Sequence, residues 1–282
     1  MKIIEKRLTA YEKRTLWMSR IVVWAVILLV VFPALWIVMS SFSAGDSFFL
    51  SSLFPDKLST EHYVELFKET DFLLWVWNSF KLCVIVAFIQ LALTSSAAYS
   101  FSRMRFLGRR YGLMFLLVLQ VFPNSMAISG YYILLYQFGL VDNMPVLILV
   151  LAGGSAFQIW LLKSYMDGIP KELDEAAMVD GAGYFTIFVK IIIPLAIPQL
   201  AVIFLFSFIA TYSEYVISSV FLQTPGNMTL ALGLQSFISD QFAAHWTLFS
   251  AAAVLSSLPI MIVFMFLQKY IQNGLVAGGV KG

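Results

Sequence analysis

Six apolar stretches divide this chain, and each is long enough to cross the hydrocarbon interior of a membrane as an α-helix. An interior of about 30 Å needs roughly 20 residues at a rise of 1.5 Å per residue. A helix also satisfies its backbone hydrogen bonds internally, which lipid requires. The sequence therefore predicts an all-α membrane protein with six transmembrane helices, at about residues 21–43, 72–99, 112–136, 146–162, 195–222 and 247–270.

Composition agrees with this interpretation. Of the 282 residues, 60% are hydrophobic and 12% are charged, whereas a soluble domain has about 25% charged residues. The net charge of +2 is too small to favour a nucleic-acid partner. We expect membrane lipid around a single transmembrane domain spanning residues 1–282.

The first apolar run has a basic leader, so a cleaved signal peptide is an alternative to a permanent span. Its apolar part, Ile21 to Met39, is longer than the 7–15 residues usual for a signal peptide, and five further runs follow. We therefore expect it to remain as a span.

The distribution of Lys and Arg predicts the orientation. Fifteen of the 18 fall before the first span, after the second, after the fourth or after the last. Because cytoplasmic loops carry the excess of positive charge, both termini are predicted to be cytoplasmic. Residues 102–111, 163–194 and the tail 271–282 are then inside, and residues 44–71, 137–145 and 223–246 are outside.

No catalytic chemistry can be assembled from the sequence. It contains no phosphate-binding GxxxxGK[ST], HExxH or GxSxG pattern, and only two histidines, so we expect no catalytic residue, metal site or cofactor in this chain. Glu214 is a candidate functional acid, because a carboxylate inside a span is costly and usually has a role. The alternatives are a protonated or hydrogen-bonded acid inside the bundle, or an acid that water reaches at the outer end of the span.

The longest predicted cytoplasmic segment, 163–194, contains a short polar helix. Pro170 suits its first position, acidic residues follow in the first turns against the helix dipole, and Gly181 can end it in left-handed geometry. The expected helix has about 11 residues. One face would carry Leu173, Ala176, Ala177 and Asp180.

So short a helix is marginal in water on its own. It is therefore either packed against a partner or laid in the membrane interface as an amphipathic helix. After it, the spacing predicts a helical face against the bundle, formed by Phe185, Phe188, Ile191 and Ile192.

The order of residues in this segment resembles a known motif. Glu175-Ala176-Ala177, then Gly181, then Ile191-x-Ile193-Pro194 resembles the EAA-x3-G-x9-I-x-L-P loop of ABC importer permeases, with isoleucine for leucine. The resemblance continues in the carbohydrate-uptake group of these permeases, and the closing Asn273–Gly282 is similar to the tail of MalG-type maltose/maltodextrin subunits. It covers nearly the whole chain from the first span.

The resemblance implies a type I ABC importer permease fold and a function in importing oligosaccharides. Maltose or maltodextrin is the first expectation, and galactan-derived oligosaccharides are the alternative. The implied partners are a second, MalF-like permease subunit, a dimeric MalK-like ATPase that uses ATP and Mg²⁺, and an extracytoplasmic sugar-binding protein.

The resemblance also assigns residues to these partners. The coupling contact with the ATPase would be made by Leu173, Asp174, Glu175, Ala176, Ala177, Asp180, Gly181 and Ala182. The tail at the ATPase interface would comprise Gly278, Gly279, Val280, Lys281 and Gly282. The loop that contacts the binding protein would carry Ser239, Asp240, Gln241 and Phe242.

Two other classes compete with this interpretation. An ion-coupled secondary carrier would need intramembrane acids or bases as relays, and the spans offer few besides Glu214. A structural membrane scaffold would need no coupling loop. The motif and the scarcity of intramembrane charge favour the importer.

Overall fold

The computed structural model describes residues 9–45, 54–55, 57–121, 124–153, 156–239 and 244–279, with the backbone alone at 124–125 and 273–279. Helices make up most of these ranges. The chain packs as two compact units, one from residues 1–70 and 237–255 and one from residues 71–236 and 256–282.

The first unit is built on the long helix α1 (Ala10–Ser41). A capping box begins it, because the Glu12 amide donates to Thr9 Oγ1 and the Thr9 amide donates to Glu12 Oε2. Its apolar side chains are largely exposed, as a helix that faces lipid requires. At its end, Ser41 lies 2.8 Å from the hydroxyl of Tyr63 in α2 (Glu61–Glu69).

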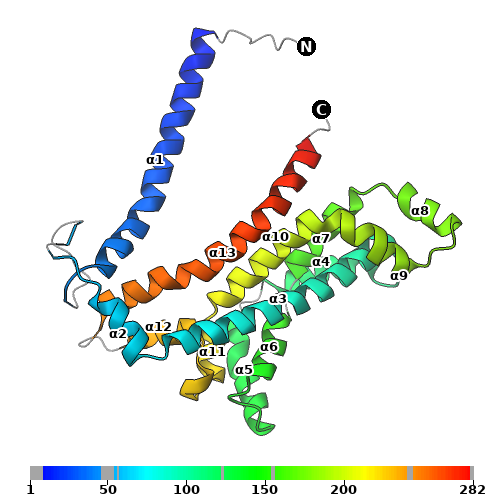
Figure 1. The fold of residues 1–282 in the computed structure, drawn as a ribbon. Coiled ribbons are helices and arrows are strands. Elements are labelled where there is room, and N and C mark those ends of the chain that lie inside the picture. Colours follow the sequence, from blue (N-terminus) through cyan, green and yellow to red (C-terminus); the bar gives the residue numbers. More distant parts are fainter. Residues whose placement is uncertain are drawn as a thin grey trace. The chain divides into compact units, whose positions relative to one another are not determined.

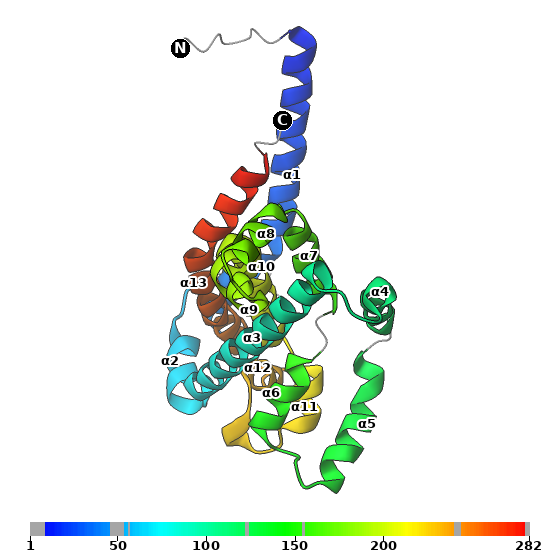
Figure 2. The same ribbon diagram turned by 90° about the vertical axis from the view of Figure 1, so that its right-hand side faces the viewer.

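The second unit is arranged around α3 (Phe72–Arg103). Figures 1 and 2 show α10 running alongside α3, and α7, α6 and α12 also pack on it. The remaining bounds are α4 Arg109–Leu119, α5 Asn124–Gln137, α6 Met144–Ala152, α7 Ala156–Asp167, α8 Glu172–Val179, α9 Tyr184–Ile187, the π-helix η1 Phe188–Ile192, α10 Ile193–Tyr212, α11 Val216–Phe221, the 3₁₀ helix η2 Pro225–Asn227, α12 Leu230–Ser236 and α13 Trp246–Gly279.

In the described part of this unit, two apolar clusters stabilise the packing. The first joins the Arg103 end of α3 to α7, η1 and α10, with Leu162, Ile192 and Ile203 fully buried. The second joins the middle of α3 to α6 and α11, through Val86 and Leu147 among others. α3 therefore connects the two ends of the unit's core.

Among the described residues, four helical segments are long and apolar enough to cross a membrane. They lie at Ala10–Ser41, Phe72–Arg103, Tyr184–Tyr212 and Trp246–Gln272, and the pair α6 and α7, bent by 50°, would make a fifth. The expected run 112–136 is instead occupied by α4 and α5, which have 11 and 14 residues. Phe122 and Pro123, between them, lie outside the described residues. The count of six spans therefore stays a prediction.

The expected span over 195–222 is not one helix, which corrects its boundary. α10 ends at Tyr212, and α11 begins at Val216. The Glu214 carboxylate accepts hydrogen bonds from the amides of Ile217 (2.6 Å) and Ser218 (2.9 Å). It thus satisfies the free N–H groups at the start of α11, which favours a new helix over continuation of the old one.

Gly233 in α12 packs directly on an aromatic ring. A Cβ at this position would overlap the six-membered ring of Trp75, and Trp75 is itself buried. Overpacking of this kind costs about 1–3 kcal/mol. We expect Gly233→Ala to lower the midpoint of thermal unfolding in detergent. Gly226→Ala is the control, because its Cβ would meet open space, and an equal loss there would contradict the packing argument.

Asp142 joins the turn after α5 to the segment after α11. Its carboxylate accepts hydrogen bonds from the amides of Gln223 (3.0 Å) and Thr224 (3.2 Å), from the Thr224 hydroxyl, and from the Asn227 side chain (3.2 Å). Chiefly because of the Thr224 hydroxyl, the pKa of Asp142 is lowered from 3.8 to about 2.

This lowered pKa predicts a pH dependence of stability. A carboxyl whose pKa is lower in the folded state stabilises the fold above its unfolded pKa and loses that contribution as the pH falls through the folded value. The contribution should therefore be full above about pH 4 and should fade towards about pH 2. Thermal unfolding scans should show wild type losing stability relative to Asp142→Asn over that window. Parallel curves would contradict the assignment.

Candidate functional site

The polar helix expected between the fourth and fifth apolar runs is present as α8, Glu172–Val179. Figure 1 shows it beyond the ends of α3 and α7, on the connection from α7 to α9. The expected start at Pro170 is wrong by two residues. The Leu173 amide donates to the Pro170 carbonyl at 3.4 Å, so the proline begins a turn that leads into α8 and itself lies just before the helix.

The end of α8 confirms the predicted role of Gly181. Its φ is +86°, in the left-handed region that favours glycine. The Gly181 amide donates to the Met178 carbonyl (3.0 Å), and the Ala182 amide donates to the Ala177 carbonyl (2.9 Å). These two bonds form a Schellman motif, which fixes the exit of the chain from the helix.

The structure divides the predicted coupling residues between two faces of α8. Leu173, Glu175, Ala176 and Asp180 are exposed. In contrast, Asp174 is only 5% exposed, which corrects the expectation that its side chain is available to a partner.

Two further side chains complete these faces. Ala177 packs partly against the apolar core, on the same side as Asp174. Val179 is 88% exposed and lies three residues after Ala176, so it extends the outward face. Sequence reasoning missed Val179, although the i, i+3 spacing from Ala176 could have indicated it.

A buried ion pair holds α8 to the end of α3. Arg103 Nε lies 2.5 Å from Asp174 Oδ2, and the two side chains are 4% and 8% exposed. The same guanidinium donates from Nη2 to the Ile169 carbonyl at 2.8 Å. Removing one partner of such a pair leaves a buried charge without its counterion, so Arg103 fixes the position of α8.

Further polar contacts surround the end of α3. Ser102 donates to Asp167 Oδ1 (2.7 Å), and Lys163 pairs with Asp167 Oδ2 (2.5 Å). Arg109 donates to the carbonyls of Phe101 (3.0 Å) and Ser102 (2.9 Å), which are among the last carbonyls of α3 and have no partner within the helix. α3, α7 and the start of α4 are therefore joined by directed bonds.

The segment after α8 returns to the same helix. The Tyr99 hydroxyl donates to the Tyr184 carbonyl at 3.1 Å, and the Tyr99 and Phe188 rings lie 4.9 Å apart. Of the expected inward face, Phe188, Ile191 and Ile192 do pack on the core, but Phe185 is 78% exposed. α3 thus contacts the segment on both sides of Gly181.

The π-helix η1 stands just before two prolines. Pro194 and Pro198 both lie in α10. A proline has no N–H to donate, and its ring crowds the carbonyl four residues earlier. For Pro194 that carbonyl belongs to Lys190, inside the wider turns of η1, so the chain continues without a break where an α-helix would be crowded.

The other candidate residues lie elsewhere. Ser239 is exposed, and Asp240, Gln241 and Phe242 lie outside the described residues. Gly278 and Gly279 end α13, and Val280, Lys281 and Gly282 lie outside the described residues. Glu214 has its carboxylate engaged at the start of α11, where it also accepts a bond of 2.5 Å from the Ser218 hydroxyl.

Comparison with known proteins identifies the family of this chain. Residues 8–276 match the family model described as binding-protein-dependent transport system inner membrane component. The chain belongs to this family. It is an inner-membrane component of a transport system, as its loop motif predicted.

Two relatives and one solved structure show how far the similarity extends. The chain is 38% identical to the maltodextrin transport system permease protein MdxG of Bacillus subtilis (strain 168), over 90% of this chain and 92% of that one. It is also 38% identical to the galactooligosaccharides transport system permease protein GanQ of the same organism, over 90% and 91%.

The solved structure confirms the fold. A bacterial ABC transporter involved in importing the acidic polysaccharide alginate matches with a TM-score of 0.79 and 23% identity, over 94% of this chain and 99% of that one. The permease fold predicted from the sequence is therefore shared with an ABC importer.

Proposed function

We propose that the chain is one permease subunit of an ATP-driven importer that carries oligosaccharides across the cytoplasmic membrane, with maltose or maltodextrin as the first substrate. The maltodextrin permease MdxG supports this choice. The galactooligosaccharide permease GanQ is equally similar, at 38% identity, so galactan-derived oligosaccharides are the second candidate.

The proposed topology has six spans and two cytoplasmic termini. The bent pair α6 and α7 would be one span and the pair α4 and α5 another, which adds two to the four long helices. The concentration of Lys and Arg beside α8 and at both termini supports this orientation.

In this proposal α8 docks on a MalK-like ATPase subunit that uses ATP and Mg²⁺. The observation that carries it is the combination of an exposed outward face, with Leu173, Ala176 and Asp180, and an inward face fixed by Asp174 to α3. A helix held in this way moves with α3 as one body. Closure of the ATPase would therefore be transmitted to the helix at the centre of the unit, as alternating access requires.

The same proposal assigns the contacts with the remaining partners. A second, MalF-like permease subunit would complete the pathway, and the tail from Gly278 would contact the ATPase interface. The loop from Ser239 to Phe242 would contact the sugar-binding protein. Glu214 has a structural role at the start of α11 in this proposal, because its carboxylate already accepts two amide bonds.

Reconstitution tests the proposal. The chain, its partner permease and the ATPase would be placed in proteoliposomes with the sugar-binding protein, and uptake of labelled maltotriose and of a galactotriose would be measured with and without ATP. We expect ATP-dependent uptake of maltotriose. Preference for the galactoside would indicate the second substrate. Uptake driven by a proton gradient without ATP would contradict the proposal of an ATP-driven importer.

A further inference from the structure

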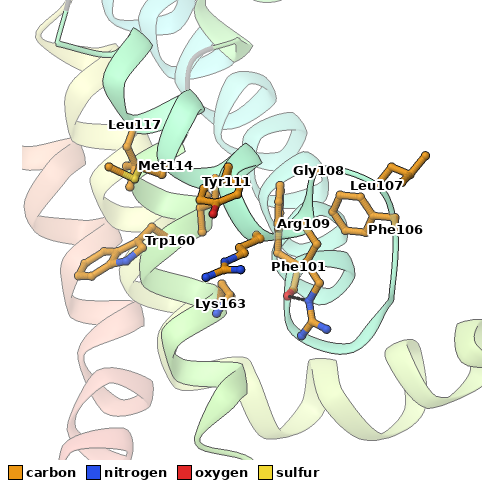
Figure 3. A pocket seen from close by; sticks show the side chains of 12 residues that line it. Phe101, Phe106, Leu107, Gly108, Arg109, Tyr111, Met114, Leu117, Trp160 and Lys163 are labelled. Carbon is orange, nitrogen blue, oxygen red and sulfur yellow. Dashed lines mark hydrogen bonds between the residues drawn. The ribbon is translucent and has the colours of Figure 1, made fainter.

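A basic pocket opens between the loop after α3, the first turns of α4 and the middle of α7. Its volume is about 950 Å³, and Arg109, Arg110 and Lys163 line it together with Tyr111, Met114 and Trp160. Figure 3 shows Arg109 on the right, Trp160 and Met114 on the left, and Lys163 between them. Cationic and aromatic side chains therefore share one cavity.

The positive charge of this pocket is only partly compensated. None of the lining residues is acidic. Arg109 donates to two neutral carbonyls, which hold the guanidinium in place without neutralising it. Arg110 lies 5.3 Å from the centre of the Tyr111 ring, and no carboxylate in the described part of the chain pairs with it. Only Lys163 has an acidic neighbour, Asp167.

An apolar stripe continues from the pocket along α4. Tyr111, Met114, Phe115 and Val118 follow one another at i, i+3, i+4 and i+7, so they share one face. All four are exposed, Met114 to 66%. Trp160, at the edge of the same pocket, is of the residue type that anchors at membrane headgroups.

We propose that this pocket binds the headgroup of an anionic phospholipid, with its phosphate on Arg109 and Arg110 and an acyl chain along the stripe of α4. Basic pockets between transmembrane helices on the cytoplasmic side bind such headgroups. A soluble anion would use the cations but not the stripe, whereas a phospholipid matches both. The site is separate from α8 and does not depend on which sugar is carried.

Native mass spectrometry of the intact transporter complex tests this site. The delipidated complex would be titrated with phosphatidylglycerol, with phosphatidylcholine of the same acyl chains, and with glycerol phosphate. We expect phosphatidylglycerol to bind at least tenfold more tightly than either. Arg110→Gln should weaken its binding about fivefold, the usual effect of one basic residue near an anionic surface.

Arg105→Gln is the matched control. Arg105 lies in the same loop and is exposed, but it does not line the pocket, so its removal changes the net charge equally and should leave binding unchanged. Equal loss in both variants, or equal binding of the two lipids, would overturn the site. Binding of glycerol phosphate as tight as that of the lipid would assign the pocket to a soluble anion instead.

A second outcome would also overturn the proposal. The stripe of α4 could be covered by the second permease subunit. A photocrosslinking residue at Met114 would then join the two subunits rather than label lipid, and Arg110→Gln would leave lipid binding by the complex unchanged.

Discussion

Gly181→Val should abolish ATP-driven sugar uptake while leaving insertion of the chain in the membrane intact. Gly181 has a φ of +86°, and a residue with a Cβ loses about 1–2 kcal/mol in this conformation, more when it is β-branched. The two Schellman bonds would then be strained, and the exit of the chain from α8 would change. We expect at least a tenfold loss of uptake in proteoliposomes, with the amount of chain in the membrane within about twofold of wild type.

Two further variants distinguish backbone strain from side-chain bulk as the cause of the lost uptake. Gly181→Asn tolerates left-handed angles but adds a side chain at the surface, so failure of this variant would indicate that bulk blocks the ATPase contact. Gly183→Ala is the control, because its φ is −81° and its Cβ would meet open space. If Gly181→Val transports at the wild-type rate, α8 is not the coupling element.

The end of α8 could be predicted from sequence because its cause is local. A glycine after an acid-started helix specifies a left-handed residue through its own backbone freedom. The inward direction of Asp174 had no such local cause. It depends on Arg103, 71 positions earlier in the chain, and one sequence gives no measure of which distant charges meet.

The helix breaks inside the apolar runs were also beyond sequence reasoning. Residues 195–222 and 112–136 read as continuous because hydropathy averages over a window. The break before α11 is specified by Glu214, whose carboxylate accepts hydrogen bonds from the amides of Ile217 and Ser218. This is a geometric relation among three residues within five positions of the chain. The sequence identifies Glu214 as an acid within an apolar run, but it does not indicate which backbone amides the carboxylate will bind.

Asp174→Asn should separate ATP hydrolysis from transport more sharply than any change on the exposed face of α8. The substitution keeps the shape of the side chain but leaves the Arg103 guanidinium buried without its counterion. Breaking a buried ion pair in this way costs about 3–5 kcal/mol, so we expect a lower unfolding midpoint and a weakened hold of α8 on α3. At a permissive temperature, the complex should hydrolyse several times more ATP per sugar transported than wild type.

The control and the rescue distinguish coupling from folding. Glu172→Gln removes an exposed acid from the same turn and should change neither stability nor the ratio of ATP to sugar. In the double variant Arg103→Met with Asp174→Leu, apolar side chains replace the pair, an exchange that is often neutral for stability. If the double variant is stable and still hydrolyses excess ATP, the ion pair itself transmits the movement of α8 to α3. If its ratio returns to the wild-type value, any firm packing at this point is sufficient, and the charges serve only to specify the fold.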